Sequence, residues 1–134
     1  MRIILDTNVF ISGVFFSGPP YEILKAWHDG QVSLVLSPEI FEEYERVGES
    51  LSEKFSGVSI EPFLYLVSSE AEIVNSPPLP ASVCEDLDDD KFLACAIAAD
   101  ARLIVTGDKE LLATSGYSDI EIIQPRKFVD QYLK

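Results

Sequence analysis

Short apolar runs alternate with longer amphipathic stretches along this chain. Residues 3–5, 32–36 and 103–106 are almost continuously apolar, and residues 120–123 form a weaker run of the same kind. Continuous apolar runs are typical of strands that are buried on both faces, as in a parallel sheet. Residues 72–75 are a candidate fifth strand.

Helical patterns lie between these runs. Helices are expected at residues 20–28, 38–47, 51–55, 61–69, 89–99, 109–113 and 125–132. The clearest helix start is at Ser37, a favourable N-cap, with Pro38 at the first helical position. In the stretch 89–99, four apolar residues are spaced to face a core together: Phe92, Leu93, Ala96 and Ile97.

The alternation of strands and helices predicts the fold class. Parallel strands joined by right-handed crossovers form a three-layer α/β/α sandwich, here with a sheet of about five strands. A chain of 134 residues suits a single domain spanning 1–134. The proline-rich stretch 76–80 is expected to be an extended connector inside that domain.

Apolar runs and cysteines indicate a cytoplasmic protein without a membrane segment. No run approaches the ~18 apolar residues that would indicate a membrane helix, and the apolar run before Asp6 is too short for a signal-peptide core. Cys84 and Cys95 lack the spacing of a metal site and are expected to be reduced thiols.

The net charge of −13, with 23 acidic and ten basic residues, is unusual for a nucleic-acid-binding protein. Such proteins usually carry a basic surface. Composition alone therefore favours a well-hydrated acidic protein, and only the positions of the acids change that interpretation.

Two acids follow predicted strands directly. Asp6 closes the first strand, and Asp108 follows the run 103–106 with only Gly107 between them. Ligands of open parallel sheets bind at the carboxyl ends of the strands. Either acid alone is more often a helix cap, but together they are a plausible pair of metal ligands.

The densest acidic run, residues 85–90, places five carboxylates in six positions before the predicted helix 89–99. One or two acids would suit the positive end of a helix, but five raise one another's pKa values unless a cation relieves them. Asp86, Asp89 and Asp90 have the i, i+3, i+4 spacing that can place them on one helix face. Asp89 also stands one turn before the apolar side of the helix, which turns it toward the sheet edge.

Glu43 is the fourth candidate acid. In the helix that begins at Pro38, Glu43 lies between Ile40 and Val47 on the border of the apolar face.

A group of carboxylates without a histidine cluster or a cysteine pair indicates a site for Mg²⁺ or Mn²⁺ rather than for zinc. The lone histidine, His28, is expected to be an exposed helix residue. A glycine-rich phosphate loop and a Ser-His-Asp set are absent from the sequence.

These blocks resemble the PIN-domain family, in particular the branch that forms the toxin half of bacterial and archaeal toxin–antitoxin pairs. The resemblance is carried by residues 5–12 (LDTNVFIS), 37–44 (SPEIFEEY), 89–96 (DDKFLACA) and 104–108 (IVTGD). Their order and spacing extend through nearly the whole chain.

The resemblance implies an Mg²⁺- or Mn²⁺-dependent endoribonuclease that hydrolyses RNA, with an antitoxin partner, a homodimer and a sheet order of 3-2-1-4-5. By their matches to the family blocks, Asp6, Glu43, Asp89 and Asp108 would be the catalytic, metal-binding acids. Asn8 and Thr106 would be supporting polar groups.

The family commonly has a proline after the first acid of its third block, where this chain has Leu87 after Asp86. Asp86 is therefore either a further ligand or only a helix cap. Lys91 and Lys109 are candidates for phosphate contacts or are simply solvated lysines.

Two other functions fit parts of the pattern. A phosphatase with an aspartyl nucleophile would also place an acid at the end of the first strand. It usually has a second Asp two positions later, however, where this chain has Asn8. A catalytically silent PIN fold that binds protein or RNA agrees with the −13 charge, but the presence of all four acids favours an enzyme.

Overall fold

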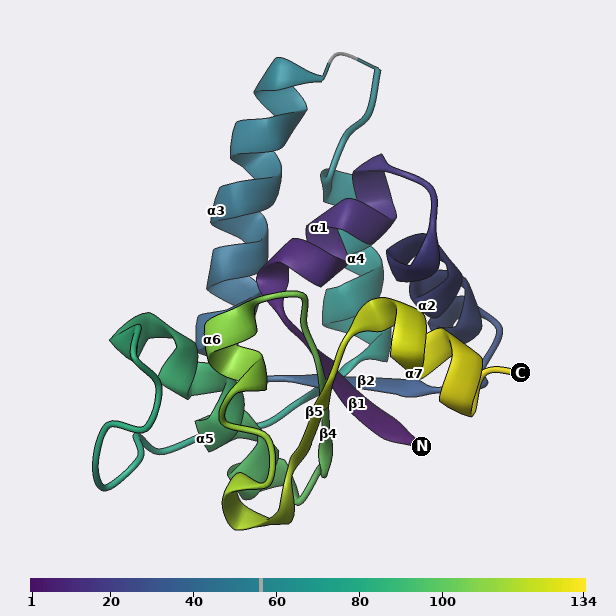
Figure 1. Ribbon diagram of the computed structural model, residues 1–134. Helices are drawn as coiled ribbons and strands as arrows, with labels where there is room; N and C mark the ends of the chain where they lie inside the picture. Colours follow the sequence, from purple (N-terminus) through teal and green to yellow (C-terminus); the bar gives the residue numbers. More distant parts are fainter. Residues whose placement is uncertain (56) are drawn as a thin grey trace.

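A five-stranded, all-parallel sheet forms the centre of the molecule (Figure 1). The structure is a computed structural model that describes residues 1–55 and 57–134, and the statements below refer to these residues. The strands are β1 (Arg2–Leu5), β2 (Ser33–Leu36), β3 (Glu72–Ile73), β4 (Leu103–Val105) and β5 (Glu121–Ile123).

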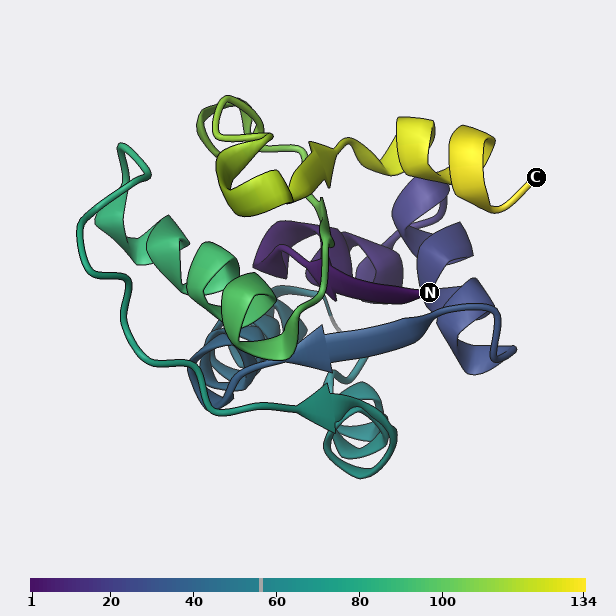
Figure 2. The same cartoon turned by 90° about the horizontal axis from the view of Figure 1, so that it is seen from below.

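Helices cover both faces of this sheet and complete an α/β/α sandwich. They are α1 (Thr7–Phe15), α2 (Pro19–His28), α3 (Pro38–Lys54), α4 (Glu61–Glu70), α5 (Asp90–Ala99), α6 (Lys109–Leu112) and α7 (Pro125–Tyr132), with single 3₁₀ turns η1 (Leu87–Asp89) and η2 (Tyr117–Asp119). Helix α2 packs against α1 and α7, whereas α5 packs against β2 and β4. Figure 1 shows α1, α2 and α4 on one side of the strands and α5 on the other. Figure 2 shows β1 and β2 side by side in the middle of the molecule.

The order of the strands is β3-β2-β1-β4-β5, which confirms the predicted 3-2-1-4-5 topology. In the central pair, Ile4 is opposite Ile104 and Leu5 is opposite Val105. The residues that follow, Asp6 and Thr106, therefore leave the sheet side by side at its carboxyl edge.

The core is a layer of aliphatic side chains from the strands, completed by aromatic residues from the helices. Tyr44 of α3 is fully buried and stacks on Phe10 of α1, with 4.2 Å between ring centroids and 5° between ring planes. The Tyr44 hydroxyl donates a 2.5 Å hydrogen bond to the Leu5 carbonyl oxygen. A buried hydroxyl needs such a partner, and this bond ties α3 to the end of β1.

Most predicted elements are present, with three corrections. Helix α1 was not predicted, because its β-branched and aromatic residues resemble a strand and its N-cap makes no side-chain hydrogen bond. The expected separate helix at 51–55 is instead the last part of α3, which runs unbroken to Lys54. Ile97, predicted to face the core, is 46% exposed, and Cys95 is buried in α5 instead.

Other expectations from the sequence are confirmed. The Ser37 side chain caps α3 by accepting a 3.3 Å hydrogen bond from the Ile40 amide. His28 is exposed and both cysteines are free thiols. In the described part of the chain, every helix is too short or too polar to cross a membrane.

The close packing of α1 on α2 requires glycine at position 13. A Cβ atom there would lie 2.6 Å from Leu24 Cδ1 and 2.8 Å from the Pro20 carbonyl oxygen. Alanine would gain about 1 kcal/mol of helix propensity, but overpacking costs about 1–3 kcal/mol and the Pro20 backbone cannot rotate away. We therefore expect Gly13→Ala to lower the free energy of unfolding in urea melts. Ser12→Ala in the same helix is the control, and a Gly13→Ala variant more stable than Ser12→Ala would contradict the packing argument.

Candidate active site

Asp6 lies at the carboxyl end of β1 and is 6% exposed. Its amide donates a 3.0 Å hydrogen bond to the Val105 carbonyl oxygen, which continues the β1–β4 ladder by one residue. The fully buried Thr106 hydroxyl donates to Asp6 Oδ2 at 2.5 Å. Burial raises the pKa of Asp6, and the negative charges of Asp108 and Glu43 add to this, against the opposing Thr106 hydrogen bond.

Thr106 connects Asp6 to Asp108. The same hydroxyl oxygen that donates to Asp6 accepts a 3.0 Å hydrogen bond from the Asp108 amide. Asp108 is the N-cap of α6, and its Oδ1 accepts from the Glu110 amide at 3.0 Å. One carboxylate oxygen of Asp108 is thus used to start the helix. Thr106 contacts both Asp6 and Asp108, and its supporting role in a reaction stays a prediction.

Asp89 brings a third carboxylate to this edge from the start of α5. One carboxylate oxygen from each of Asp89, Asp108 and Glu110 lies within 4.8 Å of the others, an arrangement that could hold a metal ion. Burial, contact with Asp108 and the charges of Asp6 and Asp86 raise the pKa of Asp89 to about 7. Of the two described acids that follow strands, Asp108 belongs to this group and Asp6 does not, and Glu110 belongs to it although sequence reasoning did not single it out.

The acidic run 85–90 does not present one shared face, which corrects that expectation. Asp86 accepts a 3.0 Å hydrogen bond from the Asp88 amide and caps η1, so the structure shows its helix-cap role. Asp90 turns to the preceding loop, where it accepts 2.7 Å and 3.3 Å hydrogen bonds from the amides of Cys84 and Val83. Only Asp89 of this run joins the carboxylate group described above.

Glu43 lies beside these acids but already has partners. Its carboxylate accepts hydrogen bonds from the Thr7 hydroxyl and the Lys91 ammonium, and Arg46 is 3.8 Å away. The Glu43 side chain is only 13% exposed. The anchoring of the adjacent Tyr44 to β1 explains why this acid of α3 turns inward.

Lys91 is the central cation of this neighbourhood. Its ammonium contacts Glu43 and also Asp88, at 2.9 Å. Burial opposes the charged form of Lys91, but the hydrogen bonds and charges of Glu43 and Asp88 outweigh burial and raise its pKa. The Lys91 hydrogen bond also lowers the pKa of Asp88.

Sequence reasoning missed Thr7, Glu110 and the pairing of Lys91 with Glu43. Thr7 follows Asp6 directly and Glu110 lies two residues after Asp108, so proximity to the strand ends was the available signal. Asn8, expected to support the site, lies exposed at the start of α1. Its supporting role stays a prediction.

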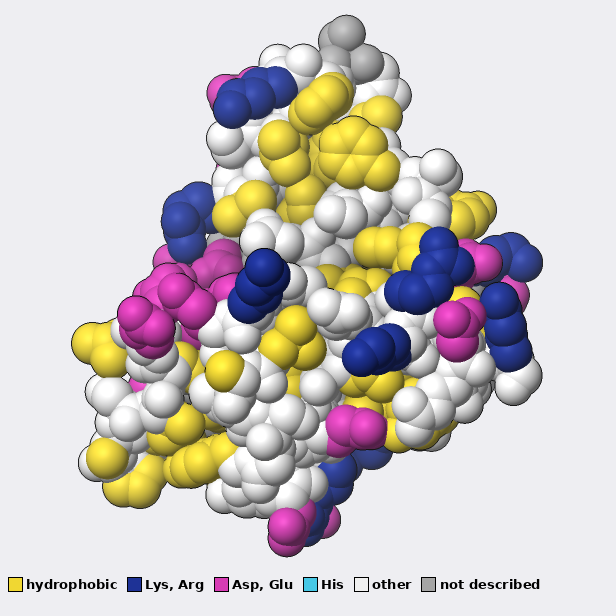
Figure 3. Space-filling model, viewed as in Figure 1, with side chains coloured by type: hydrophobic (Ala, Val, Ile, Leu, Met, Phe, Trp, Pro, Cys, Tyr) yellow, Lys and Arg dark blue, Asp and Glu magenta, His cyan; other side chains and the backbone are white. Residues whose placement is uncertain are grey.

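The residues present fit a hard divalent cation. The converging ligand atoms are carboxylate oxygens, which suit Mg²⁺ or Mn²⁺. Burial is the main cause of the raised pKa values of Asp6 and Asp89, and the like charges around them add to it. A bound cation would relieve the repulsion between these charges. Figure 3 shows acidic side chains gathered in one patch, over the region where α3, α5 and α6 meet in Figure 1.

Comparisons with known proteins give a family match and a similar fold. The family model for the PIN domain matches residues 2–110. The uncharacterized protein MJ1680 of Methanocaldococcus jannaschii is 28% identical over 146 aligned residues, which cover 100% of this chain and 93% of that protein. A chain in the crystal structure of VapBC2 from Rickettsia felis, bound to a DNA fragment from their promoter, has a similar fold. Its TM-score is 0.59 at 14% identity, and the match covers 92% of this chain and 98% of that chain.

The raised pKa of Asp89 predicts how metal-free stability depends on pH. A folded-state pKa of about 7, against an ordinary value of 3.8, means that the native protein binds this proton more readily than the unfolded chain. The Asp89 carboxylate therefore destabilises the fold above pH 7, and the cost disappears as pH falls from 7 to 4. We expect Asp89→Asn to raise the melting temperature in EDTA by a few degrees at pH 7.5 and by less at pH 5.

Thermal melts of wild type and Asp89→Asn with EDTA or Mn²⁺ check this prediction. Mn²⁺ should stabilise the wild type more than the variant, because a ligand stabilises the state that binds it. If the variant melts lower without metal and both proteins gain equally with Mn²⁺, Asp89 serves only to begin the helix.

Proposed function

This chain belongs to the PIN-domain family, and from that premise we propose that it is an Mg²⁺- or Mn²⁺-dependent endoribonuclease that hydrolyses phosphodiester bonds in single-stranded or structured RNA. The observation that carries the proposal is the approach of the Asp89 and Asp108 carboxylates, together with the Thr106 hydroxyl that connects Asp6 to the Asp108 amide. Glu43, the fourth predicted acid, lies next to them and contributes to the charge that Asp6 experiences.

The proposed roles follow from the position of each group. Asp6, Asp89 and Asp108 would hold the ion, and Glu110 adds a fourth carboxylate close to Asp89 and Asp108. The Thr106 hydroxyl orients Asp6 through its 2.5 Å hydrogen bond. A bound divalent ion would supply Lewis-acid activation of water and neutralise charge on the scissile phosphate.

The net charge of −13 is compatible with an RNA substrate because part of it lies where a metal would bind, in the acidic patch of Figure 3. A bound ion reverses the sign of the pocket that it fills. Lys91 and Lys109, which flank the proposed ligands Asp89 and Asp108 in the sequence, are the nearest candidates for contacts with neighbouring phosphates.

The proposal extends to the cellular role. The family branch that the sequence resembles is the toxin half of toxin–antitoxin pairs, and the protein of similar fold was solved as the VapBC2 complex. We therefore expect a cytoplasmic toxin that pairs with an antitoxin and forms a homodimer. The exposed aromatic side chains of Phe16 and Phe55, whose ring centroids are 5.7 Å apart, offer apolar surface for contacts with an antitoxin or with a second copy of the chain.

Loss of any one proposed ligand should abolish RNA cleavage without unfolding the protein. Asp6→Asn, Asp89→Asn and Asp108→Asn each remove one charge and keep the size of the side chain. We expect each to reduce Mn²⁺-dependent cleavage of single-stranded RNA by orders of magnitude, measured on gels with an EDTA control. Asp130→Asn on α7, where the exposed carboxylate pairs with Lys134, should retain full activity.

Near-wild-type cleavage by two of the three variants would rule out this assignment of ligands. A wild-type protein that binds RNA but does not cleave it with either metal would favour the catalytically silent binding module. Phosphate bound covalently to Asp6 would instead favour the phosphatase.

A partner that restrains the enzyme should place Arg or Lys against the carboxylates of Asp89, Asp108 and Glu110, because a cationic side chain satisfies the same carboxylates as a metal. We expect a pull-down from the source organism to recover a small basic protein, released by high salt, and expression of the chain alone to be toxic. Absence of both the partner and the toxicity would favour a housekeeping nuclease.

A further inference from the structure

The acids at the sheet edge fall into two groups that differ in their counter-charges. The first group is Asp6, Asp89, Asp108 and Glu110. Within the residues that the structure describes, none of the four forms a salt bridge. The second group is Glu43 and Asp88, and both contact the Lys91 ammonium. Arg46 adds a further positive charge 3.8 Å from Glu43.

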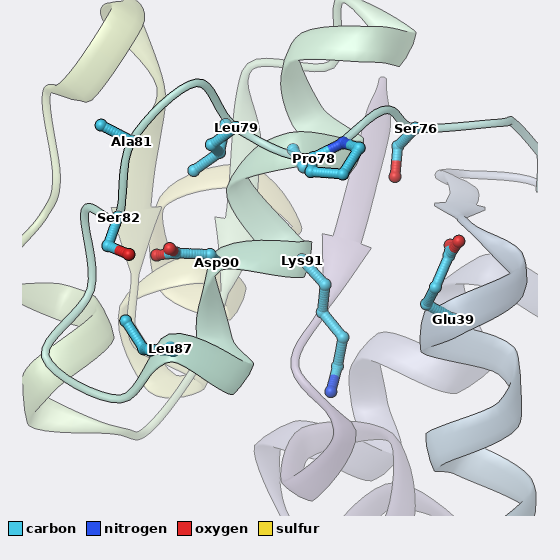
Figure 4. A pocket seen from close by; sticks show the side chains of 10 residues that line it. Glu39, Ser76, Pro78, Leu79, Ala81, Ser82, Leu87, Asp90 and Lys91 are labelled. Atoms are coloured by element: carbon cyan, nitrogen blue, oxygen red, sulfur yellow. The ribbon is translucent and has the colours of Figure 1, made fainter.

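The first turn of α5 produces this division. Asp89 joins Asp108, while the next two residues are held elsewhere: Asp90 by the amides of Val83 and Cys84, and Lys91 by Glu43. Figure 4 shows Asp90 and Lys91 pointing in different directions, with the Lys91 ammonium reaching away from the loop that Asp90 contacts. The Lys91 side chain is 15% exposed, so its charge is held in place rather than free in solvent.

Space for a cation also exists beside Lys91. A groove of about 320 Å³ is lined by Glu39, Glu42, Glu43, Arg46, Leu87, Asp88 and Lys91. Nuclease sites with two metal ions place them about 3.5–4 Å apart on shared carboxylates. Here the Glu43 carboxylate, which accepts a hydrogen bond from Thr7 beside Asp6, is already paired with a positive charge of the chain, the Lys91 ammonium.

We infer that Lys91 takes the place of a second metal ion, so that the site binds one divalent ion, on Asp6, Asp89 and Asp108. Glu43 is then a positioning residue that holds Lys91 and is not a ligand in the wild-type protein. This inference rests on the proposed function. A lysine ammonium would supply positive charge to a nearby phosphate but does not coordinate a water molecule as a metal ion does. The single divalent ion, when bound, would therefore be the group that activates the attacking water.

The number of bound Mn²⁺ ions tests the inference directly. Titration of the full chain, followed by the electron paramagnetic resonance signal of free Mn²⁺, should give one ion for the wild type. Lys91→Met keeps the length of the side chain, removes its charge and frees Glu43, so two ions are expected. Lys91→Arg restores the charge, and the double variant Glu43→Gln with Lys91→Met removes the anion too, so both should bind one ion.

Glu43→Gln is an independent test that does not require Lys91→Met to fold. We expect this variant to keep one Mn²⁺ with a Kd close to that of the wild type. Asp89→Asn should raise the Kd at least about tenfold, since even groups that only support a ligand contribute that much. A Kd for Glu43→Gln that rises as much as that of Asp89→Asn would overturn the inference.

The remaining outcomes separate this inference from the proposed function. Two ions in the wild type, or a folded Lys91→Met variant that binds one, would overturn the role of Lys91 and leave the nuclease proposal intact. A wild-type protein that binds no Mn²⁺ would overturn both.

Discussion

The parallel pairing of β1 with β4 is the constraint on which the candidate site depends. Because Leu5 is opposite Val105, the next residues of both strands leave the sheet together, and the Thr106 hydroxyl meets the Asp6 carboxylate. A slip of one residue would turn every side chain of β1 to the opposite face. The register that pairs Leu5 with Val105 buries Ile3, Ile4 and Leu5 and also aligns Asp6 with Thr106.

The surrounding structure holds together charges that repel. Of the acids Asp86, Asp89, Asp90 and Asp108, three have a local structural task that keeps the backbone in place: Asp108 caps α6, Asp86 caps η1, and Asp90 binds the loop amides of Val83 and Cys84. A cap contributes about 0.5–2 kcal/mol, which offsets part of the repulsion. Asp89 is the exception, because its side chain makes no cap hydrogen bond for α5 and its pKa is raised to about 7. Because the charge of Asp89 lowers stability and its side chain does not cap the helix, a functional role explains an acid at this position better than a structural role does.

The fold was largely predictable from the sequence, because buried parallel strands are read from continuous apolar runs and their ends locate Asp6 and Asp108. Helix α1 was not predicted from the sequence. Residues such as Val9, Phe10 and Ile11 have a high intrinsic propensity for strands, and they are helical here because α1 packs on α2 and α3. The spacing of Asp86, Asp89 and Asp90 in the sequence led to the wrong prediction of a shared helix face, because the chain changes from a 3₁₀ turn to an α-helix within that run. Pairings such as Lys91 with Glu43, 48 residues apart, depend on how α3 and α5 pack, which spacing cannot reveal.

The distribution of charge matters more for an RNA substrate than its total. At physiological ionic strength, charges more than about 8 Å apart in solvent are largely screened. A distant acid such as Asp130 on α7, itself paired with Lys134, therefore has little effect on a phosphate at the sheet edge. What a phosphate meets there is the charge of Asp6, Asp89 and Asp108, which form no salt bridge with the other described residues, offset by any bound ion. A net charge of −13 therefore does not exclude RNA binding, and a cation bound to the carboxylate group would change whether this surface repels or attracts a polyanion.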